Sequence, residues 1–275
     1  RSAGSPAATS VHRLYLAGGD QVHSERVKED FEETTGGRML SDAYVSQVSV
    51  AGAPELFVMP DSIGSLLYAV LGAKSVAGAA DPFTHTLTVA ASLPYLTFWR
   101  MLANGLYERF ADCKVTHLKL HGESGKPLRA TATVMGLSPA FLTAAEATAT
   151  IEVTNRFMHY DGSAALLVEG AAIASISSFD IDIDNGGSLQ PGDSLTPNDV
   201  SEGSLGIIVA TDQLVANFDL WNRLHYGSAS PSNLAAPSQA VLELAGSPAG
   251  LSLTWTRVAA SRSLKVAITR VQVDT

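Results

Sequence analysis

Residues 56–72, LFVMPDSIGSLLYAVLG, form the stretch from which the fold of this chain is best inferred. The stretch opens with a short apolar run typical of a strand and continues as a helix pattern that ends at a glycine. Asp61 precedes the helix pattern, where its carboxylate can accept hydrogen bonds from the free N–H groups of the first turn. Gly72 can adopt the left-handed conformation that commonly ends a helix. The stretch therefore predicts a strand that leads into a helix over residues 62–71.

A second stretch, residues 207–227, repeats this order of features as IIVATDQLVANFDLWNRLHYG. Two further segments that follow the first helix are echoed after the second. Chance similarity of short apolar runs is the alternative explanation, but the preserved order favours an internal duplication. The matched positions are Leu56 with Ile207, Val58 with Val209, Asp61 with Asp212 and Gly72 with Gly227, and the matched segments are THTLTVA with QAVLELA (residues 84–90 and 239–245) and TFWR with TWTR (residues 97–100 and 254–257).

The duplication predicts a mainly β fold of two β-sandwich or barrel modules in tandem, each with one flanking helix. We place the modules at residues 1–155, which include a plain N-terminal arm, and at residues 156–275. The second helix is expected over residues 212–226. Apolar residues three or four positions apart mark the face of each helix that should pack under the sheets. These helix-core residues are Leu66, Leu67, Val70, Leu214, Phe218 and Trp221.

The composition describes a globular, acidic chain. Its 275 residues, of which 46% are hydrophobic, can bury a full core without metal or disulfide support. A net charge of −9, from 18 basic and 27 acidic residues, argues against a tight binder of nucleic acid or anionic membranes. The single cysteine, Cys113, excludes an internal disulfide, and we expect it to be a buried apolar residue. We expect no membrane span, because no run of about 18 apolar residues occurs.

Several other segments have local patterns. Residues 113–121 and 128–134 alternate in polarity on either side of a short Ser-Gly turn, which predicts a hairpin. The charged segment 24–33, SERVKEDFEE, is interpreted as a solvated loop or surface helix. Residues 141–149 are compatible with a short helix or a strand, and we leave them open. Residues 186–203 form a long loop rich in Gly, Pro, Asp and Asn, and such a loop is usually functional or disordered.

No residue pattern predicts catalysis. His117 and His121 have the spacing of two metal ligands on one helix face, but their segment, HLKLH, also alternates as a strand. In a strand, residues four apart are separated by about 13 Å, too far to share one metal ion. The chain contains no GxSxG, P-loop or GxGxxG motif. We therefore expect no enzyme activity and assign no catalytic, cofactor or metal residue.

The segment FDIDID, residues 179–184, is the most informative polar pattern. In a strand, Asp180, Asp182 and Asp184 lie on one face and the apolar residues on the other. This predicts a strand with one core face and one dense row of unneutralised carboxylates. A solvated edge strand, or calcium ligands on a neighbouring loop, are the alternative interpretations.

Taken together, the chain resembles the major tail tube proteins of long, flexible-tailed bacteriophages. The resemblance covers most of residues 40–275 and contains no catalytic signature. The sequences that carry it are PDSIGSLLYAVLGA, FTHTLTVAASLPYLTF, CKVTHLKLHGESGKPLRATATVMG, SSFDIDIDN with its downstream loop, and LKVAITRVQV.

The resemblance implies a structural virion protein with no cofactor, which self-assembles into stacked rings around a tape measure protein. The rings would form the hollow tail tube through which DNA is ejected, and long loops and terminal arms would join them. It also implies contacts with a tail terminator and a distal tail protein, no membrane partner, and assembly in the host cytoplasm before residence in the virion tail. DNA would pass without tight binding, with the three aspartates of FDIDID lining the lumen.

Two questions stay open at this stage. If such rings close with six modules, a chain of two modules forms a trimer with pseudo-sixfold symmetry, whereas a chain of one larger module forms a hexamer. We expect the trimer, with the hexamer as the alternative. The alternative function is that of a two-domain β-sandwich adhesin or receptor-binding protein, which the strand pattern would fit equally well.

Overall fold

The structure is a computed structural model that describes residues 10–30, 43–59, 62–78, 84–103, 105–146, 148–150, 157–158, 165–168, 171–213, 251–257 and 262–268. Within them the chain is mainly β, with a single short helix. The elements are β1 (Ser10–His12), β2 (Leu16–Asp30), β3 (Ala43–Phe57), α1 (Ile63–Leu71), β4 (Gly72–Ala77), β5 (Thr84–Val89), β6 (Leu96–Ala103), β7 (Leu106–Glu123), β8 (Arg129–Leu142), β9 (Thr148–Thr150), β10 (Ala165–Val168), β11 (Ala171–Asp184), β12 (Ser188–Gln190), β13 (Asp199–Ser201), β14 (Gly206–Gln213), β15 (Leu251–Arg257) and β16 (Arg262–Ile268).

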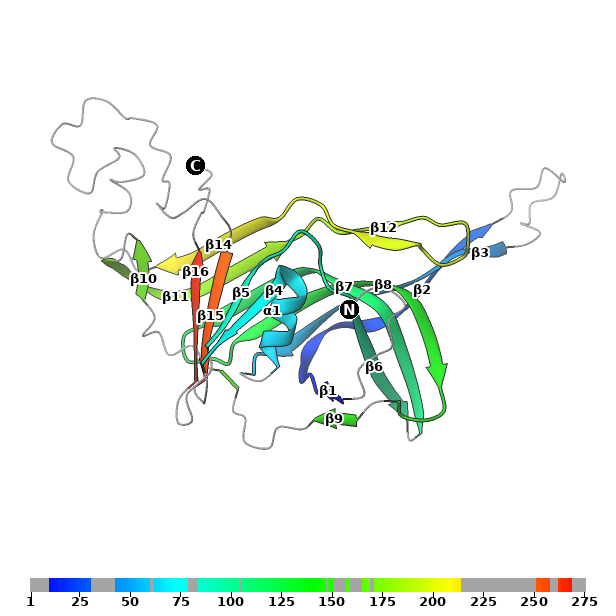
Figure 1. Cartoon of the computed structure of the whole chain (residues 1–275), viewed down its shortest axis with the longest axis horizontal. Helices are drawn as coiled ribbons and strands as arrows, with labels where there is room; N and C mark the ends of the chain where they lie inside the picture. The colour runs from blue at the N-terminus through cyan, green and yellow to red at the C-terminus, as the bar shows by residue number, and fades with distance from the viewer. Residues whose placement is uncertain are drawn as a thin grey trace, which may run out of the picture.

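The main sheet has eight strands and curls like half of a barrel (Figure 1). Its strand order is β10-β11-β7-β8-β3-β2, with β14 also beside β11 and β6 also beside β7, and all the pairs are antiparallel. Strands β7 and β8 form the predicted hairpin, with His121 opposite Arg129 next to the turn. The hairpin places the long strands β7 and β8 at the centre of the sheet.

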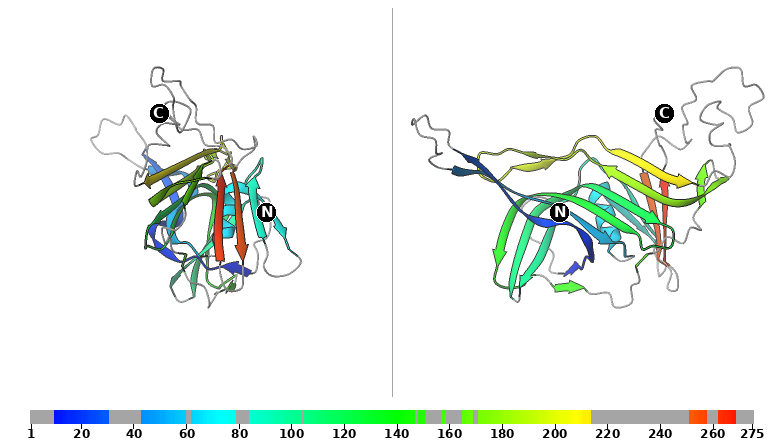
Figure 2. Two further views of the ribbon diagram at one scale, coloured as in Figure 1. Left: turned by 90° about the vertical axis from the view of Figure 1, so that its left-hand side faces the viewer. Right: turned by 180° about the vertical axis from the view of Figure 1, so that it is seen from behind.

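The β2–β3 hairpin corrects one prediction and extends another. The charged segment 24–33 was expected to be a loop or surface helix, but its residues 24–30 belong to β2. Residues 44–57 form one continuous strand, β3, so the apolar run of the opening stretch is the end of a much longer strand. Seen from behind, the far end of this hairpin projects beyond the rest of the sheet as an arm (Figure 2). The β2 part of this arm, residues 24–30 (SERVKED), is rich in charged residues and mostly exposed.

Helix α1 follows β3 and is close to the predicted helix. Ser62 is its N-cap residue, without a side-chain hydrogen bond to the first turn, and Asp61 lies outside the described residues. Gly72 ends the helix with a left-handed backbone (φ 95°), and its N–H donates to the carbonyl of Tyr68. A side chain at Gly72 would also meet Ala90 and Ser92 at under 3 Å, so the position requires glycine twice over.

The core lies on the face of the main sheet that α1 covers. Helix residues Leu66, Leu67 and Val70 are buried there, together with apolar side chains from β3, β7, β8 and β11. Leu214, Phe218 and Trp221, the other three predicted helix-core residues, lie outside the described residues. Cys113 is free and buried, as expected.

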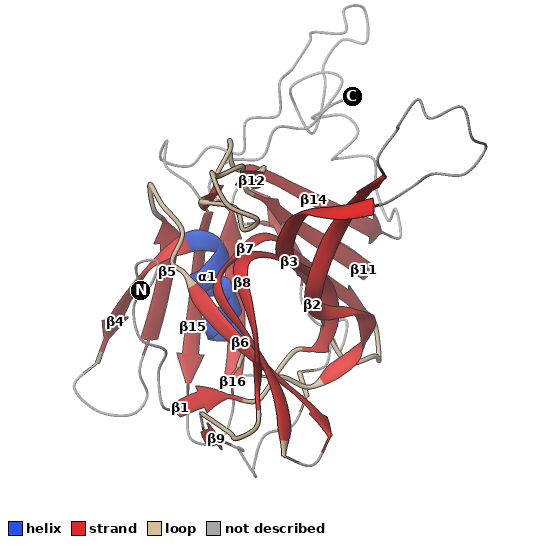
Figure 3. Cartoon of the chain, turned by 90° about the vertical axis from the view of Figure 1, so that its right-hand side faces the viewer, coloured by secondary structure: helices blue, strands red, loops and turns tan. Residues whose placement is uncertain are grey.

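A second sheet, in the order β16-β15-β5-β4, lies on the other side of α1 (Figure 3). Two of its strands come from residues 72–89 and two from residues 251–268. In the main sheet, β11 from the predicted second module pairs with β7 of the first, and β14 pairs with β11. Strands of the two predicted modules therefore share both sheets, and the described residues do not show tandem modules. Asp212 and Gln213, expected to begin a second helix, belong to β14.

Two short pairs complete the described structure. Strand β1 pairs in parallel with β9. In the segment 141–149, left open between helix and strand, residues 141–142 end β8 and residues 148–149 belong to β9. Strands β12 and β13 form a small ribbon within residues 186–203, the segment predicted to be a long loop.

Candidate functional site

The polar face of the main sheet, opposite the helix, is the first candidate site. Along β11, Ile181 and Ile183 are 6% and 0% exposed and pack into the core, whereas the aspartates between them point to the other side. The strand therefore has the predicted division into a core face and an acidic face. Because β7 and β14 flank β11, the aspartates lie within the sheet rather than along its edge.

Cross-strand pairing brings basic residues of β7 against these aspartates. In the backbone register, Asp180 is opposite His121, Asp182 is opposite Lys119 and Asp184 is opposite His117. The segment HLKLH is thus a strand in which both histidines face the aspartates. Within the described residues, no group of three His, Cys, Asp or Glu side chains could hold a metal ion.

The side chains form direct pairs rather than a row of free carboxylates. His121 Nδ1 lies 2.7 Å from Asp180 Oδ1, and Lys119 Nζ lies 3.5 Å from the other oxygen of the same carboxylate. His117 Nε2 lies 2.5 Å from Asp182 Oδ1. Asp180 therefore has a lysine partner that the sequence did not predict, and Asp182 has a histidine as its hydrogen-bond partner. The reason is that opposite charges directly across or diagonal to each other on neighbouring strands attract.

Asp184 differs from the other two aspartates. Its carboxylate accepts a hydrogen bond from the backbone N–H of Gly186 at 2.8 Å and is exposed. Asp212 of β14 lies on the same face and accepts from the hydroxyl of Ser178 at 2.5 Å. These two carboxylates carry no cationic partner in the described structure.

The pairing continues along the polar face beyond the aspartates. Lys126 binds Glu123 at 2.7 Å, and Arg129 of β8 binds Glu55 of β3 at 2.9 Å. With the histidines neutral, three cations stand against six carboxylates, so this face has a net charge of −3. We call this set the paired-charge face: Glu55, His117, Lys119, His121, Glu123, Lys126, Arg129, Asp180, Asp182, Asp184 and Asp212.

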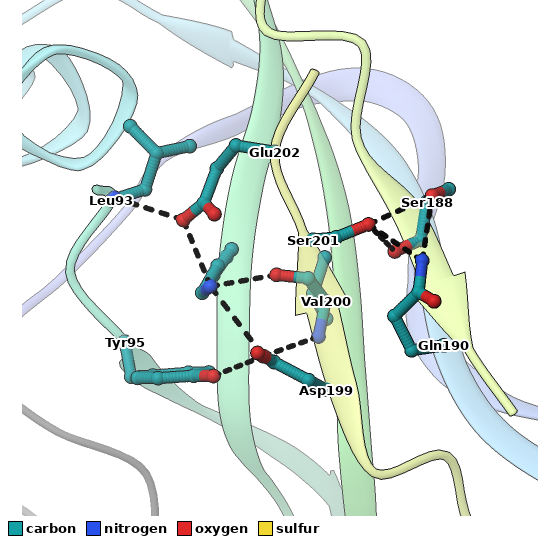
Figure 4. A network of polar contacts seen from close by, with 9 residues as sticks. Leu93, Tyr95, Ser188, Gln190, Asp199, Val200, Ser201 and Glu202 are labelled. Atoms are coloured by element: carbon teal, nitrogen blue, oxygen red, sulfur yellow. Dashed lines mark hydrogen bonds and ion pairs between the residues drawn. The ribbon is translucent and has the colours of Figure 1, made fainter. Parts of the chain in front are cut away.

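The segment 186–203 is the second candidate, and the side chain of Lys114 fixes it to the main sheet. Figure 4 shows the residues of the segment that take part, Asp199, Val200 and Glu202. This lysine of β7 is only 4% exposed. Its Nζ donates to the carbonyl of Val200 at 2.6 Å and to Glu202 Oε1 at 2.8 Å, and lies 3.5 Å from Asp199 Oδ1. Two of the three N–H groups of this buried lysine therefore donate hydrogen bonds, and the Asp199 carboxylate lies within ion-pair distance.

Two further contacts complete this anchor. Tyr95 donates its hydroxyl to the carboxylate of Asp199, and its ring centroid lies 4.5 Å from the Lys114 ammonium. Glu202 also accepts the backbone N–H of Leu93 at 2.9 Å. Midway along the segment, the carbonyl of Leu195 accepts the N–H of Val48 on β3. The segment is therefore held at residues 199–202 and again at Leu195.

The pKa values in this anchor follow from its pairing. Burial opposes the charged form of Lys114, but the hydrogen bond and charge of Glu202 outweigh it and raise the lysine pKa. Burial likewise opposes ionisation of Asp199 and Glu202, yet hydrogen bonds from Tyr95 and Lys114 respectively lower the pKa of each carboxyl group. Burial and the hydrogen bond to Asp199 raise the pKa of Tyr95. These shifts favour the charged forms of Lys114, Asp199 and Glu202 and the neutral form of Tyr95.

Sequence reasoning missed the basic half of the paired-charge face and the whole Lys114 anchor. A signal for the first was present, since HLKLH and DIDID alternate with the same period and opposite charge. No local signal marks Lys114, because its partners lie 86 and 88 residues away along the chain.

Comparison with known proteins gives one family. The sequence profile of the family described as phage tail tube protein matches residues 24–261 of the chain. The match spans the paired-charge face and the segment that Lys114 holds. No curated protein matches the chain. Among the described residues, no helix has the length and apolar character needed to cross a membrane.

Proposed function

Because the chain belongs to the phage tail tube protein family, a non-enzymatic structural family of the virion tail, we propose that it self-assembles into stacked rings that form a hollow DNA conduit. The observation that supports ring formation is a curled sheet with open edges. The sheet ends at β2 on one side and at β10, β14 and β6 on the other, and each of these has one partner strand within the described part of the chain.

Open edges favour pairing between copies. An edge strand presents unpaired N–H and C=O groups, which are a template for another strand. Closing a sheet into a barrel removes every edge at once. Ile208 of β14, a large apolar side chain that is 68% exposed, lies beside this free edge on the same face as Asp182. We propose that β14 of one copy lies beside β2 of the next.

The paired-charge face is the side of the sheet that we propose lines the lumen. Among the described residues, helix α1 and the second sheet cover the opposite side, whereas the paired-charge face is left open to a passing DNA molecule. Its charge of −3 repels the DNA backbone, which carries about one charge per 1.7 Å of axis. In this arrangement Asp180, Asp182 and Asp184 point into the channel.

The number of chains in a ring depends on how many sheets each chain contributes. The trimer expected from sequence requires two similar modules in each chain. The described residues contribute one main sheet, to which both halves of the sequence supply strands. We therefore propose six chains per ring, the alternative named from sequence.

We propose that contacts between rings are made by the β2–β3 arm and by the segment 186–203, which lies along it. The arm projects from the sheet, and the hydrogen bond between Val48 and Leu195 keeps the two parts together (Figure 1). The tape measure protein, a tail terminator and a distal tail protein are the further partners that we propose for the tube.

Negative-stain microscopy of purified protein tests the proposal. We expect hollow tubes of stacked rings, with sixfold class averages down the axis. The variant Ile208→Lys should prevent ring closure, because edge lysines block strand addition, whereas the control Val76→Lys should still form tubes. Val76 is 50% exposed on β4, away from both edges of the main sheet. Compact monomers for the unaltered protein would contradict the proposal and favour an adhesin, and threefold averages would restore the trimer.

A further inference from the structure

The basic residues at the centre of the paired-charge face form a row. His117, Lys119 and His121 occupy alternate positions of β7, so their side chains point to one side at intervals of about 6.8 Å. One strand of duplex DNA carries a phosphate every 3.4 Å or so along the axis, so this interval corresponds to about every second phosphate. Without its aspartate partners, the row would therefore have a spacing that suits the phosphate backbone of DNA.

Two aspartates of the neighbouring strand β11 contact the side chains of this row. Asp180 contacts both Lys119 and His121 through its two oxygens, at 3.5 and 2.7 Å. Asp182 contacts His117 at 2.5 Å. All five side chains are between about a third and a half exposed, so they remain within reach of a molecule that passes over the sheet.

We propose that Asp180 and Asp182 mask the basic row of β7 and so keep this face from binding nucleic acid. A phosphate that approaches Lys119 must replace a carboxylate that the sheet already holds in place, and it gains little from counterion release because the cation is already neutralised. The role is specific to these two residues. Asp184 and Asp212 add negative charge to the same face but bind a backbone N–H and a serine hydroxyl.

The value of this masking in the virion rests on the proposed function, in which DNA moves past the face. The masking itself is a property of the single chain. It is therefore testable on unassembled protein, whether or not tubes form.

The experiment compares two double variants that remove the same charge. Asp180→Asn with Asp182→Asn unmasks the basic row, whereas Asp184→Asn with Asp212→Asn is the matched control. Binding of a fluorescent 20-base-pair duplex is followed by anisotropy at 20–200 mM salt.

We expect the unmasked variant to bind the duplex at least about 10-fold more tightly than the unaltered protein at low salt. The slope of log K against log salt should steepen by about 0.9 for each cation freed. The control should gain less than about 3-fold. Adding Lys119→Gln to the unmasked variant should remove about one unit of slope.

Equal gains in the two double variants would overturn masking and leave a simple effect of net charge. No gain in either would overturn it as well. If the unmasked double variant fails to fold, the single variant Asp180→Asn replaces it, since this carboxylate alone contacts Lys119 and His121. Binding gained only by the unmasked variant, in a protein that forms no tubes, would support masking and contradict the proposed function.

Discussion

The side chain of Asn185 donates a hydrogen bond from its Nδ2 to the backbone carbonyl of Val70, at 2.9 Å, inside the core. The carbonyl belongs to the last turn of α1, where helix geometry leaves acceptors without partners. The backbone of Asn185 makes two further hydrogen bonds. Its N–H donates to the carbonyl of Thr116, and its carbonyl accepts from the N–H of Gly203. One residue at the end of β11 thus fixes the helix, the central strand and both ends of the 186–203 segment.

Asn185→Asp should lower the free energy of unfolding by about 1 to 3 kcal/mol, because a carboxylate of the same shape cannot donate to the Val70 carbonyl and both groups are buried. Urea unfolding followed by far-UV circular dichroism measures the loss. Asn198→Asp, in the exposed part of the same segment, is the control and should change stability by less than about 0.5 kcal/mol. Equal losses would show that the bond to α1 adds nothing specific.

Lys114→Met should release the 186–203 segment from the sheet. The substitution keeps the aliphatic stem but removes the ammonium from Val200, Glu202 and Asp199, and we expect a loss of about 1 to 3 kcal/mol because water can still reach the partly exposed Glu202. Hydrogen exchange of the amides of β12 and β13 should rise strongly. In the control, Lys74→Met on exposed β4, exchange of these amides should stay unchanged. Unchanged exchange in Lys114→Met would contradict the anchor.

The anchor should weaken in acid. Asp199 and Glu202 have lowered pKa values in the folded protein, so the stability they add is present above the ordinary values of about 3.9 and 4.3 and is lost as pH falls through the folded ones. Lys114 has a raised pKa, so its contribution is present below about 10.4 and is lost only at higher pH.

The difference in melting temperature between the unaltered protein and Lys114→Met should therefore stay constant from about pH 5 to pH 9. It should shrink below about pH 4. Differential scanning calorimetry across pH 3 to 9 measures it. A difference that persists at pH 3 would mean that the lysine acts through packing rather than through its ion pairs.

Leu67→Ala should destabilise the fold by about 2 to 5 kcal/mol, because the side chain is 0% exposed at the centre of the core and its removal leaves a cavity. Val76→Ala, at a position that is 50% exposed, should change the free energy of unfolding by less than about 0.5 kcal/mol. Chemical unfolding of the two variants gives the comparison. A loss below about 1 kcal/mol for Leu67→Ala would contradict the core position of this helix face.

Much of the local structure follows from the sequence. The alternation on either side of the Ser-Gly turn predicted the β7–β8 hairpin, and Gly72 marked the end of α1. The charged segment 24–33 was misread, since β2 is a largely exposed strand with polar residues on both faces. Such a strand has no alternation of apolar and polar residues by which the sequence could predict it. It is held as a strand by its hydrogen bonds with β3.

The candidate site was only half predictable. The alternation of FDIDID correctly placed Ile181 and Ile183 in the core and the aspartates on the opposite face. Their partners could not be assigned, because Asp180 and His121 are 59 residues apart and the register of a long-range strand pair leaves no mark in either segment. The duplicated segments suggested two modules because short apolar runs do not reveal which strands share a sheet.

The pairing of β5 with β15 has a consequence for synthesis on the ribosome. Leu87 lies opposite Leu253, so the second sheet cannot close until nearly the whole chain has been translated. At about 5–20 residues per second, β5 waits on the order of 10 to 30 s for its partner. A nascent chain therefore lacks its finished shape while it is still attached. During this time the edge of β5 that will face β15 lacks its partner strand.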